Sequence, residues 1–162
     1  MTEAEMRSHR CCFTGHRPDK LIRSKEQIAK DLTAAIDNAI SDGYCTFISG
    51  MAMGVDIWAA QIVLEKKIVV PDLHLICALP FPGFGDRWSS QWSDVYNEII
   101  RQADLVKSIS PSFSYASYQK RNEWMVNHSG LVIAVYNGNS GGTRNTVEYA
   151  ERYNVPCIEI FG

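Results

Sequence analysis

The feature that most constrains the fold of this chain is a regular alternation between short apolar runs and longer stretches of helical periodicity. The apolar runs lie at residues 10–15, 44–50, 73–80, 105–110, 131–137 and 156–161. Helical periodicity occurs at residues 24–42, 54–67, 86–103, 118–129 and 145–153. A run such as "LVIAVYN" is apolar on both faces, which is typical of strands buried between two helical layers. The alternation predicts an α/β fold with a doubly wound, mainly parallel sheet flanked by helices on both faces.

The length and composition favour a single domain. The chain has 162 residues, of which 46% are hydrophobic and 21% charged, and this is enough to bury a full core. We therefore predict one domain over residues 1–162, with residues 1–9 as a flexible N-terminal tail. The net charge of −2 disfavours a nucleic-acid partner, because binding phosphates along a strand requires clustered Lys and Arg.

The five cysteines predict buried thiols and no metal site. Their number is odd, none has CxxC spacing, and most lie in apolar runs. The N-terminal segment "MTEAEMRSHR" is polar, and no apolar run approaches the ~18 residues of a membrane span. We expect a cytoplasmic protein with no membrane partner, and the sequence leaves open whether it forms a homo-oligomer.

In a doubly wound sheet, ligands bind beyond the carboxyl ends of the strands, so the segments that follow the strands are the candidate site. The first is "TGHRP" at residues 14–18. Its predicted ligand contacts are Thr14, Gly15, His16 and Arg17. The guanidinium of Arg17 suits a phosphate or carboxylate. The alternative is a proline-terminated turn with polar residues on the surface.

The second segment is "FISGMAMGVD" at residues 47–56. Its glycines would let a phosphate approach the free N–H groups of the following helix, although tight packing of that helix on the sheet explains them equally well. Asp56 lies in the first helical turn, where it either complements the helix dipole or accepts from a ribose hydroxyl. The spacing fits neither G-x-G-x-x-G nor the P-loop, which disfavours a dinucleotide dehydrogenase and a P-loop NTPase. The predicted contacts are Ser49, Gly50, Met51, Ala52, Met53, Gly54 and Asp56.

Two more strand ends carry candidate residues. The loop "ALPFPGFGDRW" at residues 78–88 is stiffened by proline, and its aromatic rings either stack on a base or cover the core. The segment "NGNSGGTRNTVEYA" at residues 137–150 is a second glycine-rich helix start, which strengthens the phosphate interpretation. The predicted contacts in these two segments are Pro80, Phe81, Gly141, Gly142, Thr143 and Thr146.

Two longer segments, "ISGMAMGVDIWAAQIVLEKK" (48–67) and "YQKRNEWMVNHSGLVIAVYNGNSGGTRNTVEYA" (118–150), resemble the SLOG superfamily. This superfamily includes DNA-processing protein A, the Lonely Guy cytokinin-activating proteins and the YpsA group. The YpsA group is the most similar, because "TGHRP", "KRNEWMV" and "GGT" occur in the expected order across nearly the whole chain. The resemblance implies a single SLOG-type, Rossmann-like domain that binds a nucleotide or a nucleotide-derived ligand such as ADP-ribose or NAD.

The Lonely Guy enzymes are phosphoribohydrolases with an R-K-x-x-M helix and a P-G-G-x-G-T-x-x-E segment. Arg121 matches the arginine of the first pattern, and Glu148 matches the glutamate of the second. Arg144 and Asn145 depart from the second pattern, and no proline precedes the glycines. The resemblance implies Arg121 and Glu148 as a catalytic pair and Asn122 as a neighbouring ligand contact. The alternative is that Arg121 and Glu148 form a structural ion pair or only bind the ligand.

These observations predict a nucleotide-binding protein that acts as a ligand sensor or regulator and requires no cofactor. The alternative is a phosphoribohydrolase-type N-glycosidase that acts on nucleoside monophosphates. A single-stranded DNA-binding module ranks third, because the chain lacks a basic stripe interleaved with aromatic residues.

Overall fold

A single six-stranded sheet organises the computed structural model, which describes residues 1–162. Neighbouring strands follow the order β4-β3-β2-β1-β5-β6, and every pair is parallel. The strands are β1 (Arg10–Gly15), β2 (Thr46–Ser49), β3 (His74–Leu79), β4 (Leu105–Ser108), β5 (Leu131–Tyr136) and β6 (Cys157–Phe161). The predicted α/β fold is therefore confirmed, and the sheet is parallel throughout.

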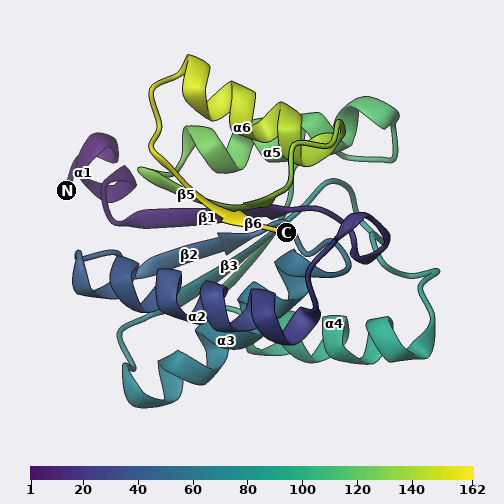
Figure 1. Ribbon diagram of the computed structural model, residues 1–162, viewed down its shortest axis with the longest axis horizontal. Coiled ribbons are helices and arrows are strands. Elements are labelled where there is room, and N and C mark those ends of the chain that lie inside the picture. The colour runs from purple at the N-terminus through teal and green to yellow at the C-terminus, as the bar shows by residue number, and fades with distance from the viewer.

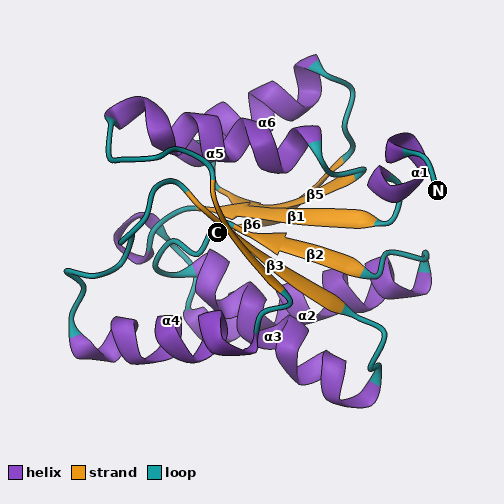
Figure 2. Ribbon diagram, turned by 180° about the vertical axis from the view of Figure 1, so that it is seen from behind, coloured by secondary structure: helices purple, strands orange, loops and turns teal.

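Helices cover both faces of the sheet, as the two opposite views show (Figures 1 and 2). The layer on one face consists of α2, α3 and α4, whereas α5 and α6 lie together on the other. The longer helices are α2 (Lys25–Ser41), α3 (Val55–Val69), α4 (Ser90–Gln102), α5 (Tyr115–Asn127) and α6 (Gly142–Arg152). Two short helices complete the fold: α1 (Glu3–Arg7) and the 3₁₀ helix η1 (Pro18–Lys20). None of the helices is long and apolar enough to cross a membrane.

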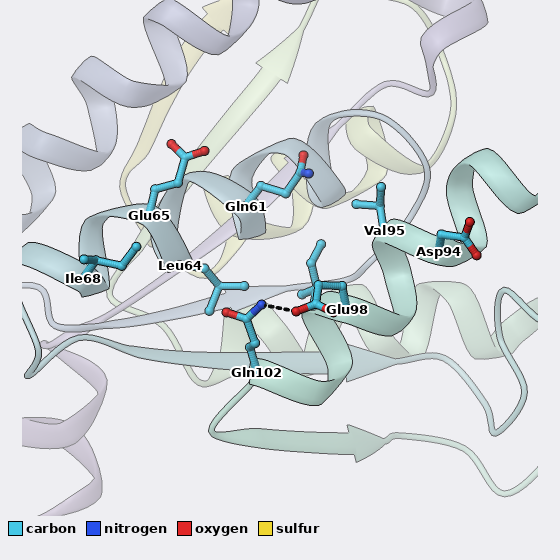
Figure 3. Close-up of a pocket in the computed structure, with 9 residues that line it drawn as sticks. Gln61, Leu64, Glu65, Ile68, Asp94, Val95, Glu98 and Gln102 are labelled. Carbon is cyan, nitrogen blue, oxygen red and sulfur yellow. Dashed lines mark hydrogen bonds between the residues drawn. The ribbon is translucent and has the colours of Figure 1, made fainter.

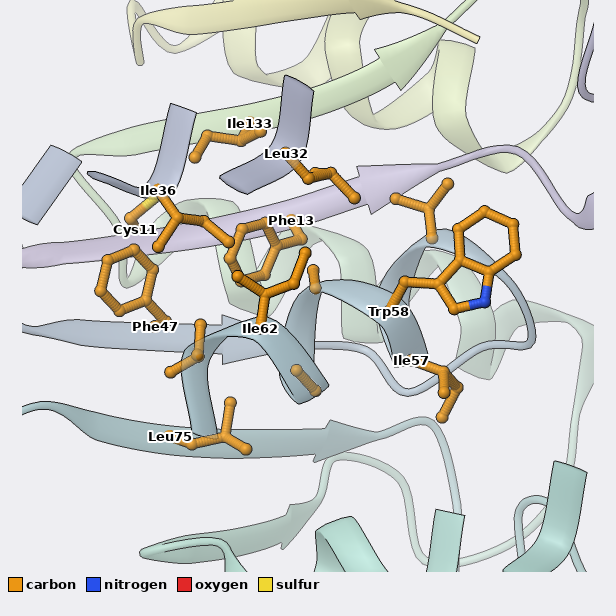
Figure 4. Close-up of a cluster of buried hydrophobic side chains, with 14 of the residues drawn as sticks. Cys11, Phe13, Leu32, Ile36, Phe47, Ile57, Trp58, Ile62, Leu75 and Ile133 are labelled. Atoms are coloured by element: carbon orange, nitrogen blue, oxygen red, sulfur yellow. The ribbon is translucent and has the colours of Figure 1, made fainter. Parts of the chain in front are cut away.

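The larger core lies between the sheet and the α2–α3 layer (Figure 4). It contains 27 buried residues, compared with 9 in the core beneath α5 and α6. The rings of Phe13 on β1 and Phe47 on β2 stack with centroids 5.9 Å apart. Leu32 and Ile36 of α2 are fully buried. Strands covered on both faces explain why the central runs are apolar at successive positions.

The structure adds detail at the N-terminus and differs from two expectations. Within residues 1–9, α1 forms with a Thr2–Glu5 capping box, and Arg7 donates to the carbonyl oxygen of Ser129 at 2.9 Å. Helix α5 begins three residues earlier than predicted, and the hydroxyl of Ser117 binds the backbone at this start, where it accepts from the N–H of Ser114 at 3.5 Å and donates to the carbonyl oxygen of Ser114. Among the cysteines, Cys11, Cys12 and Cys77 are buried, but Cys45 and Cys157 are only half-buried.

The strand order places a crevice beside β1. The chain moves outward from β1 through β2 and β3 to β4, and then crosses back so that β5 pairs with the other side of β1. In parallel sheets, the point where the strand order reverses leaves a gap beyond the carboxyl ends of the two strands. The segments that follow β1 and β5 therefore meet at this point.

Candidate functional site

A polar cavity of about 280 Å³ lies at this edge of the sheet. We call it the polar cavity. It brings together the segment after β1, the start of α3, one face of α5 and the start of α6. Its lining residues are Thr14, Gly15, His16, Arg17, Lys20, Ala52, Asp56, Tyr118, Arg121, Asn122, Gly142 and Thr143. Ten of these twelve were predicted as site residues from the sequence, and Lys20 and Tyr118 were not.

Positive charge dominates the polar cavity. Arg17, Lys20 and Arg121 contribute three cations, and Asp56 is the one carboxylate in the lining. Arg17 and Lys20 are exposed. A concave surface with this excess of cations is suited to an anionic group such as a phosphate.

Arg121 is the most constrained cation of the site. Its side chain is buried, and its Nη1 donates to the carbonyl oxygen of Gly50 and, at 3.5 Å, to that of Ala78. Its Nε donates to Oδ1 of Asn122 at 2.8 Å. Burial lowers the pKa of Arg121, but a guanidinium remains charged in proteins. Arg121 therefore holds a fixed positive charge at the base of the cavity.

Asp56 is the buried carboxylate of the site, with 6% of its surface exposed. Its Oδ2 accepts from the N–H of Ala52 at 3.2 Å, whereas its Oδ1 has no hydrogen-bond partner. Burial raises its pKa to about 6, although the nearby charge of Arg121 acts in the opposite direction. Asp56 and Arg121 each come within about 3.0 Å of the point that a Cβ on Gly50 would occupy, but they form no direct ion pair.

His16 is a neutral donor or acceptor at the cavity wall. It is buried, and its Nε2 faces the N–H of Asn137 at 3.3 Å. An N–H donor requires Nε2 to be the acceptor, which assigns the proton to Nδ1. Burial lowers the pKa of His16, and the charge of Lys20 lowers it further. His16 therefore supplies hydrogen bonding without adding charge near neutral pH.

The glycine-rich start of α3 is largely closed by the protein itself. The N–H of Met51 donates to Oγ of Ser49, and the N–H of Ala52 donates to Asp56. A Cβ on Gly54 would lie 2.8 Å from Cδ of Pro18. Of the residues predicted here, Ala52 and Asp56 line the polar cavity, whereas Ser49, Gly50, Met51, Met53 and Gly54 do not.

The glycine-rich start of α6 is more open. Gly142 and Thr143 line the polar cavity, and Nζ of Lys20 donates to the carbonyl oxygen of Ser140 at 3.3 Å. The helix has no side-chain cap at Gly141 and no acidic residue in its first turn. Thr146 does not line the cavity, and its hydroxyl donates to the carbonyl oxygen of Gly142 at 2.8 Å. The positive end of the α6 dipole is therefore not neutralised by a side chain.

The structure does not bring Glu148 to the cavity beside Arg121. The Glu148 side chain is 53% exposed and pairs with Arg144 one turn earlier on α6, with Nε and Oε1 3.0 Å apart. Arg144 is one of the residues that depart from the Lonely Guy pattern, and its ion pair with Glu148 lies on the surface of α6. Arg121 and Glu148 therefore form no ion pair in the structure, and Glu148 does not line the polar cavity, whereas their catalytic role stays a prediction.

A second hollow of about 580 Å³, the aromatic hollow, adjoins the polar cavity. The two share Arg17 and Tyr118. The aromatic hollow is lined by Arg17, Phe81, Pro82, Gly83, Phe84, Gly85, Asp86, Arg87, Trp88, Phe113 and Tyr118. Phe81 stands edge-on to Phe113 and Tyr118, with centroids 5.4 and 5.8 Å apart. Pro80 lies outside it and is buried, with its carbonyl bound to the N–H of Ser110.

Three residues that line these hollows lie outside the strand-end segments from which the site was predicted. Lys20 follows Arg17 by three residues across η1, and Tyr118 precedes Arg121 by one helical turn on α5. Helical spacing of three residues was the signal that would have placed both beside a predicted contact. Phe113 lies in the loop before α5, and no local pattern connects it with Phe81.

A further groove of about 410 Å³ lies between α3 and α4 (Figure 3). Leu64, Ile68 and Val95 form part of its wall. Its charged residues are Glu65, Asp94 and Glu98, and its lining contains no Lys or Arg. This groove contains none of the predicted site residues, and its carboxylates would repel a phosphate.

The fold and the polar cavity define a Rossmann-like α/β protein with a candidate anion site at the switch point of the sheet. Residues 11–158 match the family model YpsA, described as the YspA SLOG family. The chain therefore belongs to the YpsA family of SLOG proteins, which confirms the resemblance inferred from the sequence.

Curated relatives are 30–32% identical to this chain over the aligned residues. The uncharacterized SPbeta prophage-derived protein YoqJ of Bacillus subtilis (strain 168) is 32% identical over 137 residues, covering 75% of this chain and 78% of that protein. The UPF0398 protein of Bacillus pumilus (strain SAFR-032) is 30% identical over 132 residues, covering 80% of this chain and 69% of that protein.

Two solved structures share the fold at 18% identity. DNA processing protein A from Streptococcus pneumoniae superimposes with a TM-score of 0.70 over 97% of this chain. The corresponding protein from Helicobacter pylori, studied for its single-stranded DNA binding mode, gives a TM-score of 0.67 over 97% of this chain. The chain spans 52% of the first structure and 66% of the second.

Proposed function

We propose that this protein binds a nucleotide or nucleotide-derived small molecule and acts as a ligand sensor or regulator. The observation that carries the proposal is the adjacency of two unlike hollows that share Arg17 and Tyr118. The polar cavity offers cations and a helix start for a phosphate. The aromatic hollow offers rings that can stack against a base. A ligand with a phosphate at one end and a base at the other uses both.

Family membership supports the same ligand class. A SLOG-type domain suggests a nucleotide-derived ligand, and the residues of the YpsA match include every residue that lines the two hollows. ADP-ribose and NAD fit this class as well as mononucleotides do, because each combines phosphate, ribose and base.

The two other candidate functions have less support. Hydrolytic release of the base would need the carboxylate of Glu148 beside Arg121. Glu148 is instead paired with Arg144 on the surface of α6. Single-stranded DNA binding, described for the H. pylori protein, would need a basic surface, whereas this chain has a net charge of −2.

Calorimetric titration and thermal-shift measurements with AMP, ADP, ADP-ribose and NAD test the proposal. We expect at least one of them to bind and to raise the melting temperature at millimolar concentration. Arg17→Ala should weaken that binding by about 1.5–3 kcal/mol, the range for a hydrogen bond to a charged group. Lys30→Ala is the matched control, because it removes a positive charge from an exposed position of α2 outside both hollows.

Failure of all four nucleotides to bind a folded sample would overturn the proposal. Equal weakening by Arg17→Ala and Lys30→Ala would show that the contribution of Arg17 is only long-range charge. Incubation with AMP followed by detection of free adenine is a separate assay for hydrolysis.

A further inference from the structure

The groove between α3 and α4 shares no lining residue with the two hollows of the candidate site (Figure 3). Its α3 side runs from Gln61 to Ile68, and its α4 side runs from Asp94 to Gln102. We call it the acidic groove. At roughly 1.5 Å per residue, each side is about 10–12 Å long, which corresponds to two helical turns.

The centre of the acidic groove is apolar. Ile99 is buried, and Leu64 and Val95 are half-buried. Ile68 extends this apolar surface toward the end of α3, and its side chain is 82% exposed, as is that of the adjacent Val69. Covering a contiguous apolar surface of this kind with another apolar surface is favourable. The groove therefore has the character of a docking surface.

The charged residues of the acidic groove are all carboxylates. Glu65 and Asp94 are exposed and have no cationic partner, whereas Glu98 pairs with Arg101 of its own helix. Both lysines of α3 pair with aspartates outside the groove and do not line it. The groove therefore carries uncompensated negative charge beside its apolar centre.

Two turns of apolar surface bordered by carboxylates complement one face of a basic amphipathic helix. In such a helix, apolar residues recur at i, i+3 or i+4, and i+7, and Lys and Arg flank them. We propose that the acidic groove is the docking site for a basic amphipathic helix of a partner protein. Nucleic acids and anionic membranes are repelled by its carboxylates. A second copy of this chain, seated groove against groove, would place the same carboxylates opposite one another.

A synthetic peptide of about 15–18 residues, long enough to form a helix when bound, is the probe. It carries leucines along one helical face and lysines on both sides of them. One control peptide has glutamates in place of the lysines, and the other has the same composition with the leucines distributed around the helix. Fluorescence anisotropy measures the affinity of each peptide for the unmodified protein. We expect the basic amphipathic peptide to bind at least about tenfold more tightly than either control.

A charge-reversed variant, Glu65→Lys with Asp94→Lys, tests whether the peptide occupies the acidic groove. Both side chains are exposed and unpaired, so the fold should tolerate the change. We expect it to bind the basic peptide at least about tenfold more weakly. The matched control is Glu151→Lys with Glu159→Lys, which changes the net charge equally at exposed positions of α6 and β6. It should bind within about twofold of the parent, because salt screens distant charges.

A variant of the apolar surface provides a second test at the same place. Ile68→Gln removes an exposed apolar side chain without changing the charge, so it should fold and should weaken binding of the basic peptide about fivefold or more. Binding that is unchanged by this substitution but lost in the charge-reversed variant would mean that the contact is electrostatic only, and the docking of an apolar helical face would be wrong.

Other outcomes would also overturn the proposal. They are failure of the basic peptide to bind, equal affinity for the peptide with redistributed leucines, and equal losses in the charge-reversed variant and its matched control. Analytical ultracentrifugation of the protein alone tests the other occupant. A dimer that dissociates in the charge-reversed variant would assign the groove to a second copy of the chain. Because the groove lies outside both hollows, these results do not depend on whether a nucleotide binds.

Discussion

The guanidinium of Arg121 lies directly against the backbone of Gly50. Its Nη1 donates to the carbonyl oxygen of Gly50, and a Cβ at this glycine would come 2.9 Å from Cζ of Arg121 and 3.0 Å from Oδ2 of Asp56. Gly50 follows directly after β2, whereas Arg121 belongs to α5 on the opposite face of the sheet from α3. The absence of a side chain at Gly50 therefore allows the base of the polar cavity to form.

Gly50→Ala should displace Arg121. The added methyl group overlaps the guanidinium, and we expect a loss of about 1–3 kcal/mol in the free energy of unfolding, as for overpacking elsewhere. Ligand affinity should fall with it. Gly142→Ala is the control for stability, since its Cβ would meet only Asn122 at an ordinary 3.8 Å. Chemical denaturation measures the stability of the two variants. An equal loss of stability in both would contradict the steric explanation.

Gly54→Ala should destabilise the fold by more than about 1 kcal/mol, although Gly54 does not line the cavity. Its φ of 92° is unfavourable for any residue with a Cβ, and that Cβ would collide with Pro18. Thermal unfolding checks this expectation. A variant as stable as the parent would show that the loop between β2 and α3 can move away from Pro18.

The strands and helices could be predicted from the sequence, because the residues that determine each of them lie within or next to it. The apolar strand β5 and the capped helix α2 are set by their own residues, and both were predicted close to their observed bounds. The site segments were found because a parallel sheet brings the carboxyl ends of its strands to one edge.

Contacts between side chains that no sequence motif connects could not be predicted. Glu148 was assigned to the site by its place in a motif, and the motif did not indicate that its carboxylate pairs with Arg144 on the surface of α6. The closure of the α3 start depends on Pro18, which lies more than thirty residues earlier in the chain. Neither the periodicity nor the composition of the sequence indicates which side chains form such contacts.

Glu148→Gln should have almost no effect on ligand binding or on stability. Its carboxylate lies on the surface of α6, and exposed ion pairs of this spacing contribute only about 0.3–0.5 kcal/mol. Titration of the variant with AMP measures its affinity. Loss of binding would mean that Glu148 leaves Arg144 and turns into the site when the ligand is bound.

Phe113→Ala should weaken the contact with the base of the ligand and leave the contact with its phosphate unchanged. Phe113 is 55% exposed, so its removal should leave the fold intact. It borders the aromatic hollow but not the polar cavity. We expect weaker binding of AMP by about 1–3 kcal/mol, the cost of losing a stacked base, and unchanged binding of ribose 5-phosphate. Titrations with both compounds provide the measurement, and equal losses would place the base elsewhere.

The buried carboxylate of Asp56 should make stability depend on pH. Its pKa is about 6 in the folded protein and 3.8 in the absence of burial, so the folded state binds more protons than the unfolded state between these values. Stability linked to Asp56 is therefore greatest below pH 4 and is lost as pH rises through 6. The groups that face it are Arg121 from α5, Arg17 after β1 and Cys12 within β1, and none of them changes charge in this window.

Asp56→Asn isolates this effect because an amide does not titrate. The free energy of unfolding of the variant, minus that of the parent, should increase by roughly 2–3 kcal/mol between pH 4 and pH 7, since each pKa unit corresponds to about 1.4 kcal/mol. His16, whose pKa is lowered by burial, acts in the opposite direction with rising pH, but it is present in both proteins and cancels in the difference. Urea denaturation at four or more pH values provides the measurement. A difference that stays constant with pH would show that the carboxylate of Asp56 is solvated in the folded protein and has an ordinary pKa.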